Sequence, residues 1–202
     1  MTDLDESRLK RMIGHFAKGK QLAFVLLLCE RMAPALNKFS KETGFDSSIY
    51  RGYLGDAWNY LDQRGSSSNY GEMAEQCLEH APDTEEFNHP LTSAALNAAL
   101  SIAATMGFLA DDDVNHIVEA AGLARDTAAL YAQDIETTPP RSLDYGEIIK
   151  HRFVQRELRQ QVEDLEFLEA LPADISQQVV PLIKRRAAGT PALLPPDDGT
   201  AR

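Results

Sequence analysis

The chain has 202 residues, of which 44% are hydrophobic and 25% are charged, and its formal net charge is −11 at pH 7. This composition is that of an ordinary globular protein with enough residues for one core. The negative charge opposes binding to nucleic-acid phosphates and to anionic lipid, so it argues against a nucleic-acid-binding or membrane-surface protein.

The negative charge is concentrated in the middle of the sequence. Residues 65–140 carry thirteen Asp and Glu against one basic residue, whereas the segments on either side are nearly neutral. A solvated face that keeps the protein soluble is the simplest interpretation. The alternative is a surface that attracts a basic protein, and its candidate interaction residues are Asp83, Glu85, Glu86, Asp111, Asp112 and Asp113.

Apolar residues recur with helical periodicity along nearly the whole chain. A short stripe over residues 9–16 precedes a helix at about 20–33 that is apolar on nearly every side, which predicts a central position in the fold. Pro34 cannot donate a backbone hydrogen bond to the carbonyl of Glu30, so we expect the helix to kink or restart there. A short helix then runs to Gly44.

The second half of the chain continues this pattern. The expected helices lie at about 49–61, 70–77, 90–108, 114–131, 145–171 and 175–183, and the last contains Pro181 in its middle. The alanine-rich helix from Pro90 allows close approach of its neighbours, and Asp111 to Asp113 suit the start of the helix after it. No alternating strand pattern with hairpin turns occurs. The sequence therefore predicts an all-α, single-domain bundle of seven to nine helices over residues 1–187, followed by a flexible tail at 188–202.

No motif of an enzyme or of a metal site stands out. The sequence has no glycine-rich phosphate loop, nucleophile elbow or paired-cysteine motif. Cys29 and Cys77 occupy apolar helical positions and fit buried free thiols. Glu147 with His151, or the acidic loop with His89, could supply part of a metal site, but the remaining ligands are missing from the pattern. We expect no catalytic residue, no metal and no cofactor.

The expected location is the cytoplasm. The apolar run at residues 22–29 is too short to span a bilayer, and the acidic residues before it and the charged pair after it do not fit a signal peptide.

Glu30 and Arg31 interrupt the most apolar helix. Adjacent helical residues point about 100° apart, so each needs a partner from another helix. The candidate partners are Arg51, Asp56, Arg156 and Glu157. We interpret the pair as an internal polar lock between helices. Two alternatives stay open: a partly exposed surface pair, and a ligand pocket formed by Glu30, Arg31, Arg51 and Trp58.

The stretch LLLCERMAPALNKFSKETGFDSSIYRGYLGDAW, residues 26–58, resembles the signature of the bacterial YjaG-like family, a domain of unknown function. A second similarity lies in FVQRELRQQVEDLEFLE, residues 153–169. The resemblance implies an all-helical cytoplasmic protein and implies no activity. The acidic loop and the alanine-rich helix depart from the family pattern.

Three functions remain open from the sequence. The first is a non-enzymatic protein-binding or regulatory module that uses an acidic surface to bind a basic protein partner. The second is an immunity protein that neutralises a basic toxin such as a nuclease. The third is a small-ligand binder or enzyme that uses the region of Glu30, Arg31, Arg51 and Trp58. A homodimer through the long leucine-rich helix is equally open.

Overall fold

The structure is a computed structural model that describes residues 6–65, 69–134 and 144–194. The described residues form nine helices and no strand, which confirms the all-helical prediction. The helices are α1 (Glu6–Gly14), α2 (Lys18–Thr43), α3 (Ser48–Leu61), α4 (Tyr70–Glu79), α5 (Thr92–Asp111), α6 (Val114–Asp134), α7 (Tyr145–Lys150), α8 (Arg152–Glu169) and α9 (Val180–Gly189).

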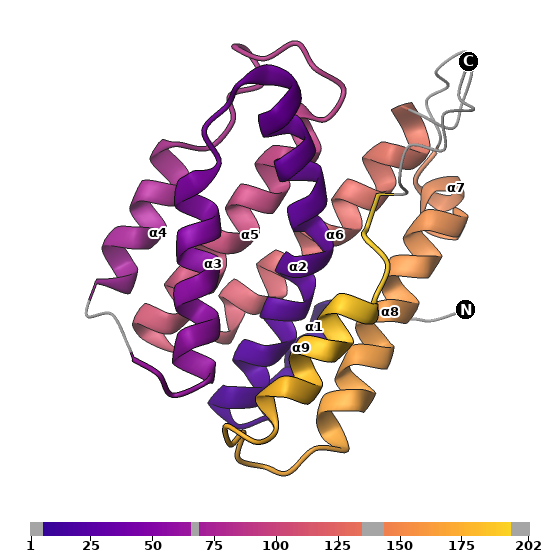
Figure 1. The fold of residues 1–202 in the computed structure, drawn as a ribbon. Helices are drawn as coiled ribbons and strands as arrows, with labels where there is room; N and C mark the ends of the chain where they lie inside the picture. Colours follow the sequence, from indigo (N-terminus) through magenta and orange to yellow (C-terminus); the bar gives the residue numbers. More distant parts are fainter. Residues whose placement is uncertain (1–5, 66–68, 135–143, 195–202) are drawn as a thin grey trace.

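Helices α2 and α5 form the centre of the bundle (Figure 1). Helix α5 packs against α2, α4 and α6, while α2 also contacts α3, α6, α8 and α9. From Leu22 to Cys29 every residue of α2 is at most 1% exposed, because neighbours cover the helix on all sides. The apolar run therefore lies in the core, as its sequence predicts.

The alanines of α5 bring its neighbours close. A side-chain carbon at Gly107 would lie 2.8 Å from Cε1 of His116 in α6, so a larger residue there would require the His116 ring to move. By length and composition α5 could also cross a membrane, but 67% of its most apolar window is buried among the other helices. It packs as the core helix of a bundle.

The expected restart at Pro34 is wrong, because α2 continues through Pro34 to Thr43 and ends at Gly44 in the left-handed conformation, with a φ of 81°. The proline leaves the carbonyl of Glu30 without its usual helical donor. The buried residues on either side of the proline, from Met32 to Leu36, hold the two halves in one helix against the core.

The expected long helix at 145–171 is two helices. His151 has an extended backbone, and its ring nitrogen Nδ1 accepts a hydrogen bond from the backbone N–H of Phe153, so it caps α8. Asp144 and Glu147 form a capping box at the start of α7. The last helix also differs from the prediction: it begins at Val180 with Pro181 in its first turn, where proline is well tolerated.

The predicted tail begins later than expected. Residues 188 and 189 belong to α9, and Leu193 is 4% exposed and donates its backbone N–H to the carbonyl of Arg31, at 2.9 Å. We call residues 190–194 the C-terminal strap, because they lie along α2 and α8 (Figure 1). Residues 195–202 lie outside the described part of the chain.

Candidate functional site

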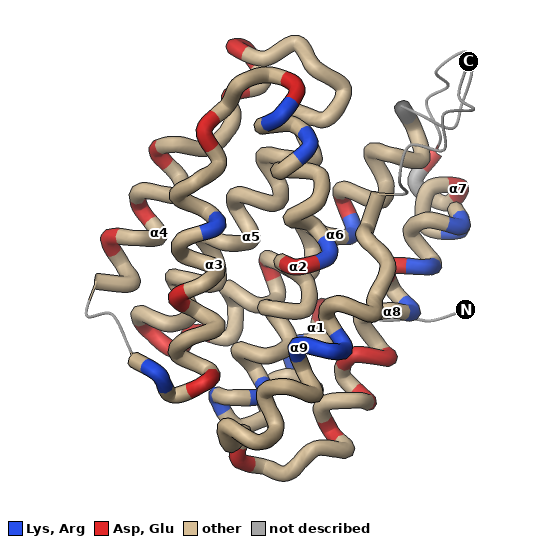
Figure 2. The backbone as a smooth tube through the Cα atoms, in the orientation of Figure 1, with Lys and Arg blue, Asp and Glu red and all other residues tan. Residues whose placement is uncertain are grey.

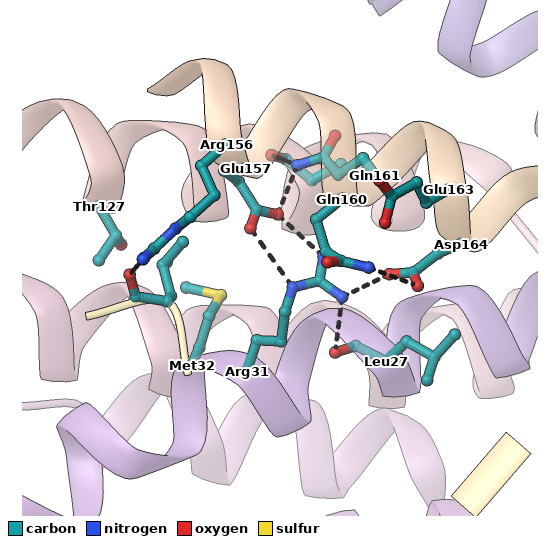
Figure 3. A network of polar contacts seen from close by, with 12 residues as sticks. Leu27, Arg31, Met32, Thr127, Arg156, Glu157, Gln160, Gln161, Glu163 and Asp164 are labelled. Atoms are coloured by element: carbon teal, nitrogen blue, oxygen red, sulfur yellow. Dashed lines mark hydrogen bonds and ion pairs between the residues drawn. The ribbon is translucent and has the colours of Figure 1, made fainter. Parts of the chain in front are cut away.

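Arg31 lies at the centre of a buried ion cluster between α2 and α8 (Figure 3). Its guanidinium is 3% exposed and binds Glu157 through two nitrogens, Nη2 at 2.9 Å and Nε at 3.3 Å. Its Nη1 donates to Asp164 and to the backbone carbonyl of Leu27. The two carboxylates are 2% and 0% exposed. A bidentate pair of this kind fixes both the distance and the rotation of the two helices.

The cluster extends to α9 and α6. Arg186 of α9 donates Nε to Asp164 at 2.9 Å, and Gln161 donates to Glu157 at 3.0 Å and to the carbonyl of Ala121 in α6 at 3.1 Å. We define the ion cluster as Arg31, Glu157, Gln161, Asp164 and Arg186. It holds two positive and two negative charges, so the buried Arg31, Glu157 and Asp164 are balanced by the partly exposed Arg186.

The electrostatic environment keeps Arg31 charged. Burial by itself lowers the pKa of the guanidinium, but the nearby charges and hydrogen bonds of Glu157 and Asp164 more than offset this and raise the pKa above its ordinary value. The donors of Arg31 are directed at protein acceptors. This arrangement can hold helices together, and it presents no reactive group to a substrate.

Glu30 points to a different neighbour. Its Oε1 accepts a hydrogen bond from Nε1 of Trp58 in α3, at 2.7 Å. The ammonium of Lys184 in α9 lies 5.5 Å from the centre of the Trp58 ring and 3.6 Å from the carboxylate of Asp62. Glu30 and Arg31 thus link α2 to α3 and to α8 separately, because adjacent residues of a helix diverge.

Arg51 does not join either group. It is exposed on α3, and the backbone N–H of Ser48 and, to a smaller extent, the charge of Arg51 lower the pKa of Asp46. The four residues of the alternative ligand pocket, Glu30, Arg31, Arg51 and Trp58, therefore do not surround one space. A cavity of about 620 Å³ lies elsewhere, where the α1–α2 turn, the end of α3 and the α8–α9 loop meet, and its lining includes Tyr60, Gln63 and Asp174.

Sequence reasoning named Glu157 but missed Asp164 and Arg186. Glu157, Gln161 and Asp164 are spaced four and three residues apart, so they share one face of α8 between the buried Leu158 and Leu165. Polar residues at the spacing of a buried face are the signal that indicates such a cluster. The part played by Arg186 depends on where α9 packs, which no local pattern gives.

The acidic residues lie in two separate places. Asp83, Glu85 and Glu86 are exposed in the loop after α4, whereas Asp111, Asp112 and Asp113 lie at the far end of α5. The 20 residues of α5 separate the ends by roughly 30 Å, since a helix rises about 1.5 Å per residue. The six residues cannot form one surface.

The Asp111–Asp113 cluster is largely paired within the protein. Asp112 forms an ion pair with Lys18, and Asp111 lies 3.2 Å from Nε2 of His116. The backbone N–H groups of Asp113 and Asn115 lower the pKa of Asp111 and Asp113, respectively. These contacts join the end of α5 to the start of α6 and give this cluster a local role.

The α4 region carries the less paired charge. Glu72, Glu75 and Glu79 are exposed on α4 and continue into Asp83, Glu85 and Glu86 of the loop, and Figure 2 shows no basic residue along this segment. We call these six residues and Leu78 the acidic surface. Leu78 is 55% exposed among the glutamates. Glu72 accepts a hydrogen bond from Asn69, while within the described residues Glu75 and Glu79 have no basic partner.

The loop of the acidic surface is anchored at its end. The Phe87 ring lies 5.2 Å from that of Phe39 and 5.9 Å from that of Phe45, measured between centroids. His89 pairs with Glu42 of α2 at 3.1 Å. The acidic side chains of the loop are therefore presented from a defined position.

Comparison with known proteins gives a consistent family. The model of the family described as "Protein of unknown function (DUF416)" matches residues 8–189. The chain is similar to the uncharacterized protein YjaG of Escherichia coli, with 25% identity over 171 residues that cover 78% of this chain and 86% of the relative. It is 26% identical over 167 residues to the uncharacterized YjaG of Salmonella typhimurium, covering 82% of each chain.

A solved structure has the same fold. The crystal structure of a DUF416 family protein from Shewanella baltica matches with a TM-score of 0.78 and 19% identity, covering 91% of this chain and 96% of that chain. At this identity the likeness concerns the fold alone.

Proposed function

The chain belongs to the DUF416 family of proteins of unknown function, and from that premise we propose that it is a non-enzymatic protein-binding module whose acidic surface docks a basic partner. Membership confirms the resemblance to the YjaG-like family read from residues 26–58. The family carries no activity that could be transferred to this chain.

The observation that carries the proposal is the exposed face of α4. Glu72, Glu75 and Glu79 are spaced three and four residues apart and form a stripe along α4, and Leu78 lies beside this stripe, one turn after Glu75. An exposed leucine at the edge of a negatively charged stripe suits a partner that brings an apolar side chain next to Lys or Arg. A surface that carries only negative charge also repels nucleic acid, so a protein is the favoured kind of partner.

The ion cluster supports a division of roles. Arg31, Glu157 and Asp164 are buried and saturate one another, so they fit the polar lock between helices. The lock holds α2, α8 and α9, whereas the acidic surface lies on α4 and its loop. Partner binding is thereby assigned to the acidic surface, and the packing of the helices to the ion cluster.

A pull-down from bacterial lysate tests the proposal. The bait is the wild-type chain, a variant with Glu72→Lys, Glu75→Lys and Glu79→Lys, or a control with Glu119→Lys, Asp126→Lys and Glu166→Lys. The control changes the net charge equally at exposed positions on α6 and α8. We expect the wild type and the control to retain the same proteins at low salt and to release them at high salt, because salt screens exposed charges.

The α4 variant should retain none of these proteins. Equal capture by all three baits, or no specific capture by the wild type at either salt, would contradict the proposed function. A basic nuclease among the captured proteins would narrow the proposal to an immunity role.

A further inference from the structure

The chain carries two small surface patches, on α4 and on α9, each with an exposed leucine beside charged residues. Among the described residues the exposed large hydrophobic side chains are Leu78, at 55%, and Leu182, at 44%. Leu78 lies on α4 among glutamates, and Leu182 lies on α9 beside a run of three basic residues. A single exposed leucine is ordinary on a protein surface. Here the charges beside the two leucines have opposite signs, so the two patches are complementary to each other.

Of the three basic residues on α9, Arg185 is the one that is exposed and has no ion pair among the described residues. Lys184 lies over Trp58 and pairs with Asp62, and Arg186 is turned inward to Asp164. Arg185 is exposed and lies one turn from Leu182, at a spacing of three residues. Leu182 and Arg185 thus repeat on α9, with opposite charge, the pattern of Leu78 and Glu75 on α4.

The two patches cannot meet within one molecule. Figure 1 shows α4 at the left edge of the bundle and α9 at its lower centre, with α3 and α2 between them. Helix α4 packs on α5 and α3, and α9 packs on α2, so their exposed faces are held apart by the core. Their complementary charges and matched leucines can be used only between two copies.

We propose that a second copy of this chain docks on the acidic surface through α9, with Leu182 against Leu78 and Arg185 against Glu75. This inference rests on the proposed function, whose docking surface it uses, and it identifies the basic partner surface as α9 of a second copy, within a chain whose net charge is −11. Each copy carries both halves of the contact, so the assembly forms through α4–α9 contacts that either close as a pair or continue around a ring.

Charge reversal with rescue is the test. Sedimentation velocity at about 0.15 M salt, which screens the long-range repulsion between two chains of net charge −11, compares the wild type with Glu75→Arg and with Arg185→Glu, each alone and then mixed in equal amounts. Each variant alone brings like charges together in every α4–α9 contact, and we expect its self-association to be at least roughly tenfold weaker. In the mixture both contacts regain opposite charges, so complexes should form again with nearly the wild-type dissociation constant.

Matched controls are Glu119→Arg on α6 and Arg159→Glu on α8, both exposed and outside the two patches, and they should associate like the wild type. Leu78→Ser removes the apolar contact without a change of charge and should also yield monomers. Circular dichroism of every variant verifies that each one is folded.

A wild type that stays monomeric at about 0.15 M salt, or folded variants whose mixture stays monomeric, would overturn the inference. The proposed function would survive that result if the monomer still captured a basic protein that the α4 variant lost. Capture of a basic protein by a monomeric chain would therefore contradict this inference alone, whereas self-association without capture would contradict the pull-down prediction alone.

Discussion

At the scale of single residues, Arg31 is the side chain through which α2 and α8 are joined. Glu157 and Asp164 surround its guanidinium at exposures of 2% and 0%. Removing one partner of a buried ion pair leaves the remaining charge buried without an opposite charge. This change destabilises a protein far more than replacing the whole pair by apolar residues does.

We predict that Arg31→Met lowers the free energy of unfolding by about 3–5 kcal/mol, because it leaves the buried Glu157 without a cation and Asp164 with Arg186 alone. Urea unfolding followed by the fluorescence of Trp58, the one tryptophan of the chain, measures it. The exposed Arg159→Met is the control and should change stability by no more than about 0.5 kcal/mol. A loss below about 1 kcal/mol for Arg31→Met would contradict the role of a lock.

The two thiols allow a prediction about pH. Burial raises the pKa of Cys29 and of Cys77 from 9.0 to about 12. The folded protein therefore keeps both thiols protonated where the unfolded chain ionises them, so their contribution is present below pH 9 and is lost as the pH rises from 9 towards 12. Each thiol should steepen the loss of stability by about 1.4 kcal/mol per pH unit in that window.

Urea unfolding between pH 7 and 10.5 measures this slope, and a variant with Cys29→Ala and Cys77→Ala is the comparison. Native thiols should also stay unreactive towards a disulfide reagent at pH 8, since the thiolate is the reactive form. Rapid modification of the folded protein, or the same slope in the variant, would show that the thiols are not buried as described.

At the scale of elements, the C-terminal strap and α2 depend on each other. The backbone N–H of Leu193 bonds to the carbonyl of Arg31, three residues before Pro34, and Arg156 of α8 donates to the carbonyl of Leu193. A proline loosens the helical hydrogen bonds of the turn before it. The strap supplies a donor for that turn and covers α2 beside the ion cluster.

Leu193→Ala should therefore lower the free energy of unfolding by about 2–3 kcal/mol, the typical loss for a buried leucine side chain. Leu194→Ala, at a half-buried neighbour, is the matched control and should cost less. Urea unfolding of the two variants decides between a docked strap and a loose tail: equal, negligible losses would favour the loose tail.

Element types followed from the sequence more readily than element ends. The apolar period located α3 to within a residue, and Gly44 marked the end of α2. The break at His151 was missed because an apolar stripe does not reveal a change of backbone direction when a side chain caps the next helix. The continuity of α2 was missed because tertiary packing outweighs the local cost of Pro34.

Partners in space were the least predictable part of the candidate site. Glu157 could be named because a buried charge requires an opposite charge on a neighbouring helix. One alternative placed Trp58 in a pocket with Arg51, whereas Trp58 donates a hydrogen bond to Glu30, because the rotation of α3 about its axis cannot be read from its own sequence. Charge counts likewise placed the acidic residues in one segment but could not show that α5 holds them at two ends.

At the scale of the whole molecule, charge is divided between surfaces. The acidic residues of α4 and its loop lie apart from the basic residues of α9 (Figure 2), and the two positive and two negative charges of the ion cluster balance. We expect a molecule with this charge distribution to bind a basic partner on the side of the acidic surface, with an association rate that falls as salt rises. Its stability is set mainly by the core and the ion cluster, so surface charges can change without loss of the fold.

The central claim is that partners bind at the acidic surface. Hydrogen–deuterium exchange of the wild-type chain, alone and with the purified protein that it captures, tests this most directly. The account predicts slower exchange within residues 70–86 and unchanged exchange around Arg31 and Asp164. Protection confined to other helices, with residues 70–86 unaffected by the bound partner, would contradict it.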